Sequence, residues 1–160
     1  MKKNYIKEIR SKVGHQKIFL NFVAGALFDN NGSLFLQRRG DTKKWGLPGG
    51  AIELDENFND ALKREFYEET GINIVLTNLI GVYTHKSHVI KYPNGDMCQP
   101  IVVLYKVTPN SKISTKKKNS ETLELSFFEH NQLPTITNKQ HEEMIRDCFK
   151  LNLSSVTRKI

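Results

Sequence analysis

The stretch that decides the fold is residues 49–72, GGAIELDENFNDALKREFYEETGI. It opens with a glycine pair that follows an apolar run, and its spacing then predicts a helix from about Asn57 to Thr70. Either Asp55 or Asn57 can cap the N-terminus of this helix, because both residue types accept hydrogen bonds from free backbone N–H groups. Gly71 suits the position just beyond its C-terminus.

This helix carries acidic residues on the side that should face the protein interior. On a helical wheel at about 100° per residue, Glu65 and Glu69 fall within roughly 20° of Phe58, and Glu68 lies at the edge of the same face. A solvated acidic face should instead lie opposite Phe58. An inward carboxylate is unfavourable unless a cation pairs with it, so the pattern predicts a cation site. The apolar members of this face are Phe58, Ala61, Leu62 and Phe66.

Length and composition indicate one globular domain. The chain has 160 residues, of which 38% are hydrophobic and 26% are charged. The only cysteines, Cys98 and Cys148, have no CxxC spacing, which favours a reduced, cytoplasmic compartment over disulfides or a zinc site. The apolar run 18–28 follows charged and polar residues, so we interpret it as a buried strand rather than as part of a signal peptide. No run approaches the ~20 apolar residues of a membrane span.

The charge distribution is uneven. The chain carries a net charge of +7, yet residues 53–69 hold seven acids against two bases, so that segment carries −5 and the remainder +12. A basic body around an acidic patch suits a polyanionic ligand that arrives with a divalent metal ion. The charge also permits nucleic-acid binding, although no basic helix interleaved with aromatic residues supports it.

The rest of the chain alternates between strand and helix patterns. We expect an N-terminal helix and extension in residues 1–16, a main domain in residues 17–150 and a tail, frayed after Asn152, in residues 151–160. An exposed, mobile loop is expected at 109–120, where three consecutive lysines occur. Within these regions the expected helices are 4–13 and 137–151, and the expected strands are 18–28, 33–39, 51–54, 72–82, 101–107 and 123–128, with a hairpin across 84–97.

The spacing of the fixed residues resembles the Nudix box, and every fixed position of that pattern is filled. The flanking segment 45–49 and the pair Leu133-Pro134 before the last helix also look like this family, so the resemblance extends over most of residues 17–150. It implies a MutT-like hydrolase of the ADP-ribose pyrophosphatase type. The implied fold is an α/β (α+β) sandwich of the α/β/α type with a mixed, curved β-sheet. The residues that match the box are Gly50, Glu56, Arg64, Glu65, Phe66, Glu68, Glu69, Gly71 and Ile72.

The resemblance implies hydrolysis of a nucleoside diphosphate linked to another group X. The substrate can be a nucleotide sugar such as ADP-ribose or a nucleoside triphosphate, and Mg²⁺ is the implied cofactor, with Mn²⁺ as a substitute. The +12 body and the lysine loop favour an alternative, the removal of pyrophosphate from RNA 5′ ends. A non-catalytic nucleotide-binding regulator is a third hypothesis, although no box glutamate is lost. Family members are often homodimers, and no membrane partner is implied.

By the same resemblance, Glu65, Glu68 and Glu69 are catalytic metal ligands, joined by a backbone carbonyl of Gly49 or Gly50. Arg64 would orient Glu68 or Glu65, or would only support the helix as the i,i+4 partner of Glu68.

Three further acids have open roles. Glu56 binds the water shell of a second metal ion or only favours the helix N-terminus. The general base is Glu65 itself or a carboxylate from a late loop, for which Glu121 and Glu124 are the candidates.

The remaining candidates would contact the substrate. Arg38 or Arg39 would bind phosphate, whereas strand-end arginines are often only solvated. Trp45 or Tyr83 would stack on the base, with core packing as the alternative. The glycine-rich segment 45–50, including Gly50, can bring the backbone close to a ligand. His85 and His88 are candidates for acid–base work or phosphate contact, although a lone histidine is more often structural.

Overall fold

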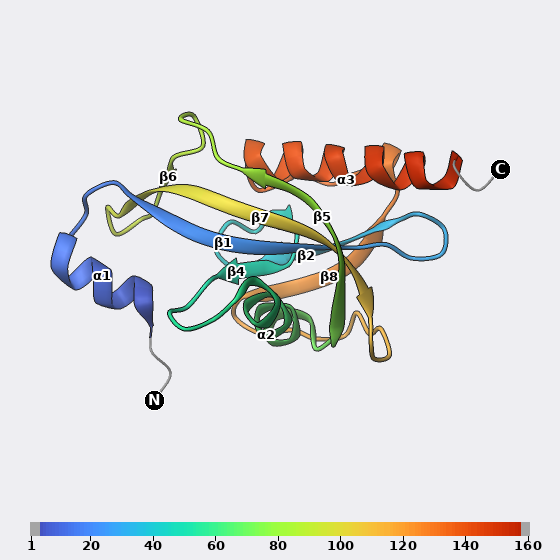
Figure 1. Cartoon of the computed structure of the whole chain (residues 1–160), viewed down its shortest axis with the longest axis horizontal. Coiled ribbons are helices and arrows are strands. Elements are labelled where there is room, and N and C mark those ends of the chain that lie inside the picture. Colours follow the sequence, from blue (N-terminus) through green and yellow to red (C-terminus); the bar gives the residue numbers. More distant parts are fainter. Residues whose placement is uncertain (1–3, 158–160) are drawn as a thin grey trace.

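The sheets form a central layer between two helices. The computed structural model describes residues 4–157, with side chains as far as Leu153. Helix α2 (Phe58–Thr70) lies on one side of the strands and α3 (Lys139–Thr157) on the other (Figure 1). The remaining elements are α1 (Tyr5–Val13), β1 (Ile18–Leu27), β2 (Leu34–Arg39), β3 (Trp45–Gly46), β4 (Gly49–Ala51), β5 (Ile74–Tyr83), β6 (Ile90–Lys91), β7 (Met97–Pro109), β8 (Thr122–Phe128) and the 3₁₀ turn η1 (His130–Gln132).

The strands form two sheets. The larger sheet has the order β4-β1-β7-β5, with β6 paired to β7, and the smaller one has the order β3-β2-β8. Strands β1 and β7 pair in parallel, whereas β1–β4, β5–β7 and β2–β8 are antiparallel. The predicted α/β/α sandwich with mixed, curved sheets is therefore confirmed.

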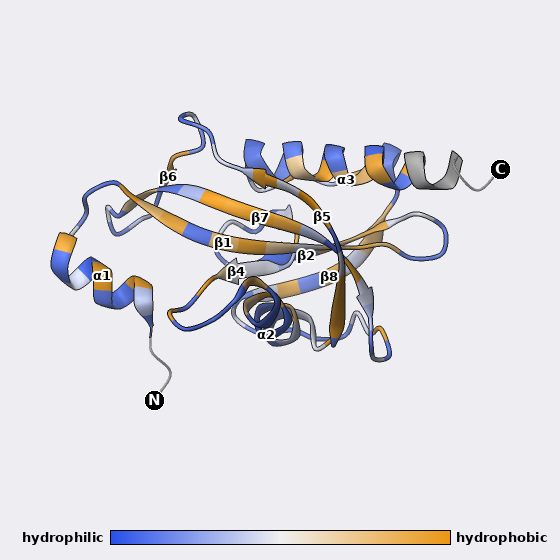
Figure 2. Cartoon of the chain, viewed as in Figure 1, coloured by the Kyte–Doolittle hydropathy of each residue, from blue (hydrophilic) through white to orange (hydrophobic). Residues whose placement is uncertain are grey.

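Side-chain alternation along the strands builds two separate cores. On β1, Val23 and Leu27 pack toward α2, whereas Ala24 and Ala26 pack toward α3. Successive residues of a strand point to opposite faces, so a strand covered on both sides is apolar throughout. Figure 2 shows the apolar residues along β1 and β7 and on the side of α3 that faces the sheet. Strand β7 is also covered on both faces, because Val107 belongs to the α2 core and Leu104 to the α3 core.

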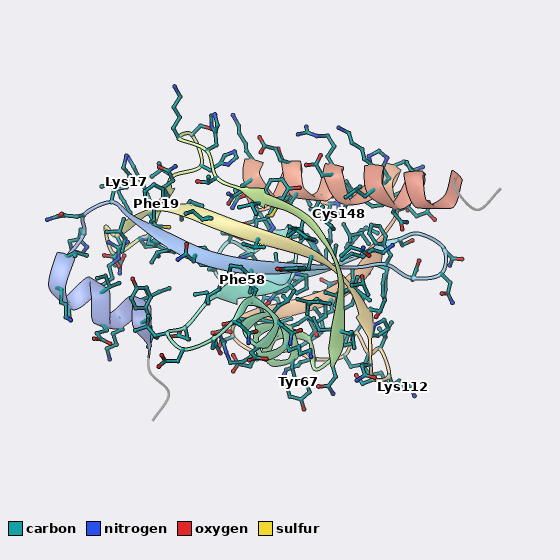
Figure 3. All side chains as sticks on the ribbon, viewed as in Figure 1. Lys17, Phe19, Phe58, Tyr67, Lys112 and Cys148 are labelled. Carbon is teal, nitrogen blue, oxygen red and sulfur yellow. The ribbon has the colours of Figure 1, made fainter. Side chains whose placement is uncertain are left out.

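Three expectations differ from the structure. Helix α3 continues to Thr157, so the prediction of a tail frayed after Asn152 was wrong for residues 153–157, and residues 158–160 lie outside the described part. Phe58, the reference of the helical wheel, is 46% exposed on the first turn of α2 (Figure 3). The strand expected at 51–54 lies earlier in the chain, because β4 comprises Gly49–Ala51 and the short strand β3 precedes it.

The N-terminal helix is tied to the main domain. The backbone N–H of Tyr5 donates to the Glu53 carboxylate (2.8 Å), and the Arg10 guanidinium donates to the carbonyl oxygen of Met97 (2.6 Å). Within residues 4–157, no helix is long and apolar enough to cross a membrane.

Candidate active site

Helix α2 buries its three glutamates to different extents. Asn57 caps the helix by accepting from the Asp60 N–H, and Gly71 ends it in a left-handed conformation. Since Phe58 is exposed, the buried face is centred near Leu62, roughly 40° away on the wheel. Glu69 lies near that centre and is 6% exposed, whereas the side chains of Glu65 and Glu68 are 17% and 40% exposed. These three glutamates are therefore graded from the core to the rim.

The glycine pair brings β4 directly against these carboxylates. The Gly49 N–H donates to Oε2 of Glu69 at 2.8 Å, and β4 is held in place by its pairing with β1. A Cβ at Gly50 would overlap the Glu65 carboxyl group, and a Cβ at Gly49 would overlap the carbonyl oxygen of Val23. Glycine at position 49 therefore permits the close approach of β4 to β1, and glycine at position 50 leaves room for the Glu65 carboxyl group.

Arg64 joins the acidic groups into one network. Its Nε and Nη2 donate to both carboxylate oxygens of Glu56 (2.5 and 2.7 Å), its Nη1 donates to Glu65, and its Nη2 also donates to the carbonyl oxygen of Ala51 (3.1 Å). Glu68 lies 3.7 Å from Nη1. Glu56 also accepts from the Glu53 N–H (3.0 Å). The contacts of Arg64 orient Glu65 more directly than Glu68, and Glu56 fixes Arg64.

Burial disfavours negative charge on the two inner glutamates. It raises the pKa of Glu65, and it raises the pKa of Glu69 to about 8, although the Gly49 N–H opposes the shift. Hard oxygen donors of this kind fit Mg²⁺ or Mn²⁺, and a bound cation would stabilise the ionised forms. Among residues 4–157, no three acidic, histidine or cysteine side chains converge on one point.

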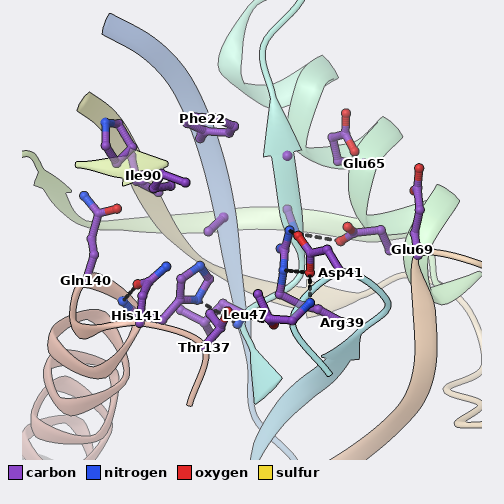
Figure 4. A pocket seen from close by; sticks show the side chains of 18 of the residues that line it. Phe22, Arg39, Asp41, Leu47, Glu65, Glu69, Ile90, Thr137, Gln140 and His141 are labelled. Carbon is purple, nitrogen blue, oxygen red and sulfur yellow. Dashed lines mark hydrogen bonds and ion pairs between the residues drawn. The ribbon is translucent and has the colours of Figure 1, made fainter. Parts of the chain in front are cut away.

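A cavity of about 610 Å³ extends from these glutamates to the N-terminal end of α3. Glu65 and Glu69 line one end, Arg39 and Asp41 lie between, and Gln140 and His141 line the other end (Figure 4). The cavity can therefore receive a charged group at the carboxylates and a flat ring near α3. Other lining residues include Phe22, Leu47, Gly49, Gly50, Ile90, Tyr92, Val102, Glu121 and Asn138.

Of the two late-loop carboxylates, only Glu121 lines this cavity. Its carbonyl oxygen accepts from the Gly40 N–H (2.9 Å), and its own N–H donates to Asn119 Oδ1 (2.9 Å), so its backbone is fixed at the end of β2. Glu124 instead pairs with Nε of Arg38 at 3.2 Å.

The two neighbouring arginines of β2 point to different places. Arg39 lines the cavity, and its Nε and Nη2 donate to both oxygens of Asp41 (3.0 and 2.9 Å). Arg38 does not line the cavity, because adjacent residues of a strand point to opposite faces. Arg39 is therefore the phosphate-binding candidate that the structure places near the glutamates.

Of the other predicted substrate residues, Gly50 lines the cavity, whereas Trp45, Tyr83, His85 and His88 do not. Trp45 packs edge-on against Phe128, with ring centroids 4.8 Å apart, and the Tyr83 hydroxyl donates to Asp147 (2.9 Å). His85 and His88 border a separate hollow of about 240 Å³. The fold directs these four side chains away from the cavity, and for Trp45 the contact with Phe128 matches the core-packing alternative.

The sequence interpretation missed the residues at the far end of the cavity. Gln140 and His141 supply polar groups there, and Phe22 and Tyr92 supply aromatic surface elsewhere in the cavity (Figure 4). These residues come from β1, the β6–β7 turn and α3, which are distant in sequence. The cluster Asn138–His141 at the start of a predicted helix was the one local sign that polar groups meet here.

Comparison with known proteins identifies the family. A NUDIX domain model matches residues 20–148, which is most of the chain. The chain belongs to the Nudix family. It is therefore a hydrolase of a family that acts on anhydrides, as the sequence predicted.

Two Nudix relatives illustrate the range of similarity. The chain is 30% identical over 155 residues to an ADP-ribose pyrophosphatase of Methanocaldococcus jannaschii, a match that covers 92% of this chain and 86% of the relative. A MutT-like protein of Streptomyces ambofaciens is 46% identical over 61 residues, which cover 38% of this chain and 40% of that protein.

Solved Nudix structures share the fold. A UDP-X diphosphatase has a TM-score of 0.70 at 19% identity, and the match covers 97% of this chain and 73% of that chain. An ADP-ribose pyrophosphatase from Streptococcus suis has a TM-score of 0.68 at 20% identity, with 83% and 91% covered. At these identities the likeness concerns the fold alone.

Proposed function

We propose that this Nudix protein is a Mg²⁺-dependent hydrolase that cleaves the pyrophosphate linkage of a nucleoside diphosphate linked to X, with ADP-ribose as the leading substrate. The observation that carries the proposal is the pair of carboxylates, the buried Glu69 and the half-buried Glu65, at one end of a cavity of about 610 Å³. The match to an ADP-ribose pyrophosphatase along 86% of that protein's length supports a nucleotide sugar.

Each residue at the glutamate end has a proposed task. Glu65, Glu68 and Glu69 hold the metal ion, with a carbonyl oxygen from Gly49 or Gly50, and Arg64 keeps Glu65 in position. When bound, the metal supplies charge neutralisation at the pyrophosphate and lowers the pKa of water. Two side chains outside α2 accept the proton and bind the phosphate.

Those groups are Glu121 and Arg39. Glu121 takes the proton from the attacking water, a task for which Glu65 is the alternative. Arg39 binds a phosphate oxygen through Nη1, because Asp41 occupies Nε and Nη2.

A substrate panel tests this function. We expect the protein with Mg²⁺ to release AMP and ribose 5-phosphate from ADP-ribose, and EDTA to abolish turnover. The panel should include UDP-sugars, nucleoside triphosphates and RNA with a 5′-triphosphate. Preferred turnover of the RNA, with affinity that falls steeply as salt rises, would replace the nucleotide sugar with RNA as the substrate. Binding of ADP-ribose without any hydrolysis over hours would instead indicate a regulator.

The general base can be tested with a matched pair of variants. We expect Glu121→Gln to lower kcat by about 10²–10³-fold with little change in KM, because an amide cannot accept the proton. Glu124→Gln is the control. Glu124 lies on β8, the strand that directly follows Glu121, but it pairs with Arg38 and does not line the cavity. Equal kcat values in the two variants would assign the base to Glu65.

A further inference from the structure

The first turn of α3 presents polar groups whose hydrogen-bonding directions are already fixed. Nδ1 of His141 accepts from the Leu47 N–H at 3.1 Å, so the ring proton of the neutral imidazole must lie on Nε2. The ring also packs against Gly46, where an added Cβ would lie 3.0 Å from Nδ1. His141 therefore offers a single defined donor, Nε2–H.

The charge state of this donor is fixed as well. Burial lowers the pKa of His141 to about 3, and the nearby Arg39 guanidinium acts in the same direction. The imidazole thus remains neutral across the pH range in which enzymes work. Within the described residues, Nε2 makes no hydrogen bond, and the residue lines the large cavity.

Gln140, the neighbouring residue, supplies the complementary group. It is 3% exposed, and its amide nitrogen donates to the carbonyl oxygen of Tyr83 at 3.2 Å. Because the nitrogen is engaged, the amide oxygen is the group left to accept a hydrogen bond. Gln140 and His141 both line the cavity at the end away from the glutamates, and Figure 4 shows them on the same helix end.

Apolar side chains line the same cavity as this donor–acceptor pair. Phe22, Ile90 and Val102 line the same cavity, and an aromatic face such as Phe22 can stack on a planar ring. A base stacked there would lose its water, so its polar edge must find partners in the protein. Adenine presents a ring nitrogen that accepts beside an amino group that donates, which is the complement of His141 and Gln140.

We propose that His141 is a specificity-determining residue that donates its Nε2–H to a ring nitrogen of the nucleotide base, while the amide oxygen of Gln140 accepts from the amino group of adenine. The proposal rests on the proposed function for its ligand, a nucleotide of adenine. His141 has a second task, because its other nitrogen holds Leu47, two residues before the glycine pair that touches Glu65 and Glu69.

Two substitutions separate these tasks. In H141N, the shorter amide oxygen stands near the position of Nδ1 and can accept from Leu47, but no donor reaches the base. In H141Q, the longer amide carries a donor near the position of Nε2, but the acceptor for Leu47 is lost. The probe is ADP-ribose compared with an indole analogue in which 4-aminoindole replaces adenine, since 4-aminoindole keeps the stacking surface and the amino group but lacks the ring acceptors.

The readout is the ratio of kcat/KM for ADP-ribose to that for the indole analogue. We expect wild type to prefer ADP-ribose by at least about tenfold, the factor for one buried donor left unpaired. In H141N the ratio should fall below about threefold, while the unfolding temperature stays at the wild-type value. In H141Q the ratio should stay at the wild-type value, while the unfolding temperature falls. A wild-type ratio in H141N would overturn the proposal.

A binding measurement keeps this inference independent of turnover. Calorimetric titration of the full chain with AMP, without metal, should give an affinity about tenfold weaker for H141N than for wild type. If wild type hydrolyses no substrate but this difference appears, the proposed reaction fails and the base site stands. If ADP-ribose is hydrolysed and H141N binds AMP as wild type does, the base site fails and the reaction stands.

Discussion

Glu69→Gln is expected to abolish hydrolysis while leaving the fold at least as stable as wild type. The substitution removes the most buried of the proposed metal ligands, and we expect kcat to fall by about a thousandfold at saturating Mg²⁺. The amide oxygen of the substituted side chain can still accept from the Gly49 N–H, which lies 2.8 Å from the carboxylate of Glu69 in the structure. Lost activity therefore should not come with lost structure.

Stability without metal gives this variant a second readout. The pKa of Glu69 rises from 4.5 to about 8 in the folded protein because the carboxyl group is buried. Between these values the folded state binds more protons than the unfolded state, so the unfolding free energy of metal-free wild type falls as pH rises. An amide does not ionise, so the variant should lack this decline.

Thermal unfolding at pH 5.5 and pH 8.5, with and without Mg²⁺, measures both effects. We expect metal-free wild type to lose stability at the higher pH and to regain it with Mg²⁺, whereas the variant changes little in either comparison. A variant that hydrolyses ADP-ribose at the wild-type rate would remove Glu69 from the site.

Gly50→Ala should separate activity from folding by a different route. The added methyl group would overlap the Glu65 carboxyl group, which is the end of a flexible side chain. The side chain can move aside, so we expect a change in unfolding temperature of only a few degrees. The displaced carboxylate is a proposed metal ligand, and misplacement by about 1 Å can cost 10²-fold in rate, so kcat/KM should fall by about a hundredfold.

Gly81→Ala on β5 is the matched control. Its added Cβ would also meet only side-chain atoms, those of Tyr83 at 3.1–3.2 Å, and Gly81 does not line the cavity. The measurements are kcat/KM with ADP-ribose and Mg²⁺ and the unfolding temperature, each for both variants. Full activity in Gly50→Ala would show that hydrolysis does not depend on the observed position of the Glu65 carboxylate.

The glutamate end of the cavity could be predicted because its parts are close in sequence. A glycine pair, one helix and its caps place Glu65 and Glu69 against β4, and local spacing determines all of these contacts. The helical wheel took Phe58 as the centre of the buried face, whereas the true centre lies near Leu62, roughly 40° away. The difference arises because Phe58 lies on the exposed first turn of α2.

The base end could not be predicted, because it depends on which strands become neighbours. Phe22 and Val102 are brought side by side only through the parallel pairing of β1 with β7, two strands that lie far apart in the chain. Trp45 was a plausible base contact by residue type, yet its strand β3 turns it onto Phe128. Residue type indicates what a side chain can bind, whereas topology decides what it meets.

The alternation of β1 between two cores has an evolutionary consequence. Residues that pack toward α2 support the helix of the proposed metal ligands, and residues that pack toward α3 support the helix of the proposed base contacts. We therefore expect that substitutions in the α3 core can change substrate preference while the packing of the α2 core, which supports the proposed metal ligands, stays the same. The hydrogen bond from Leu47 to His141 lies within the α3 layer, because Leu47 belongs to that core. Leu47 nevertheless comes two residues before the glycine pair that touches Glu65 and Glu69, so a substitution at this contact would affect both layers.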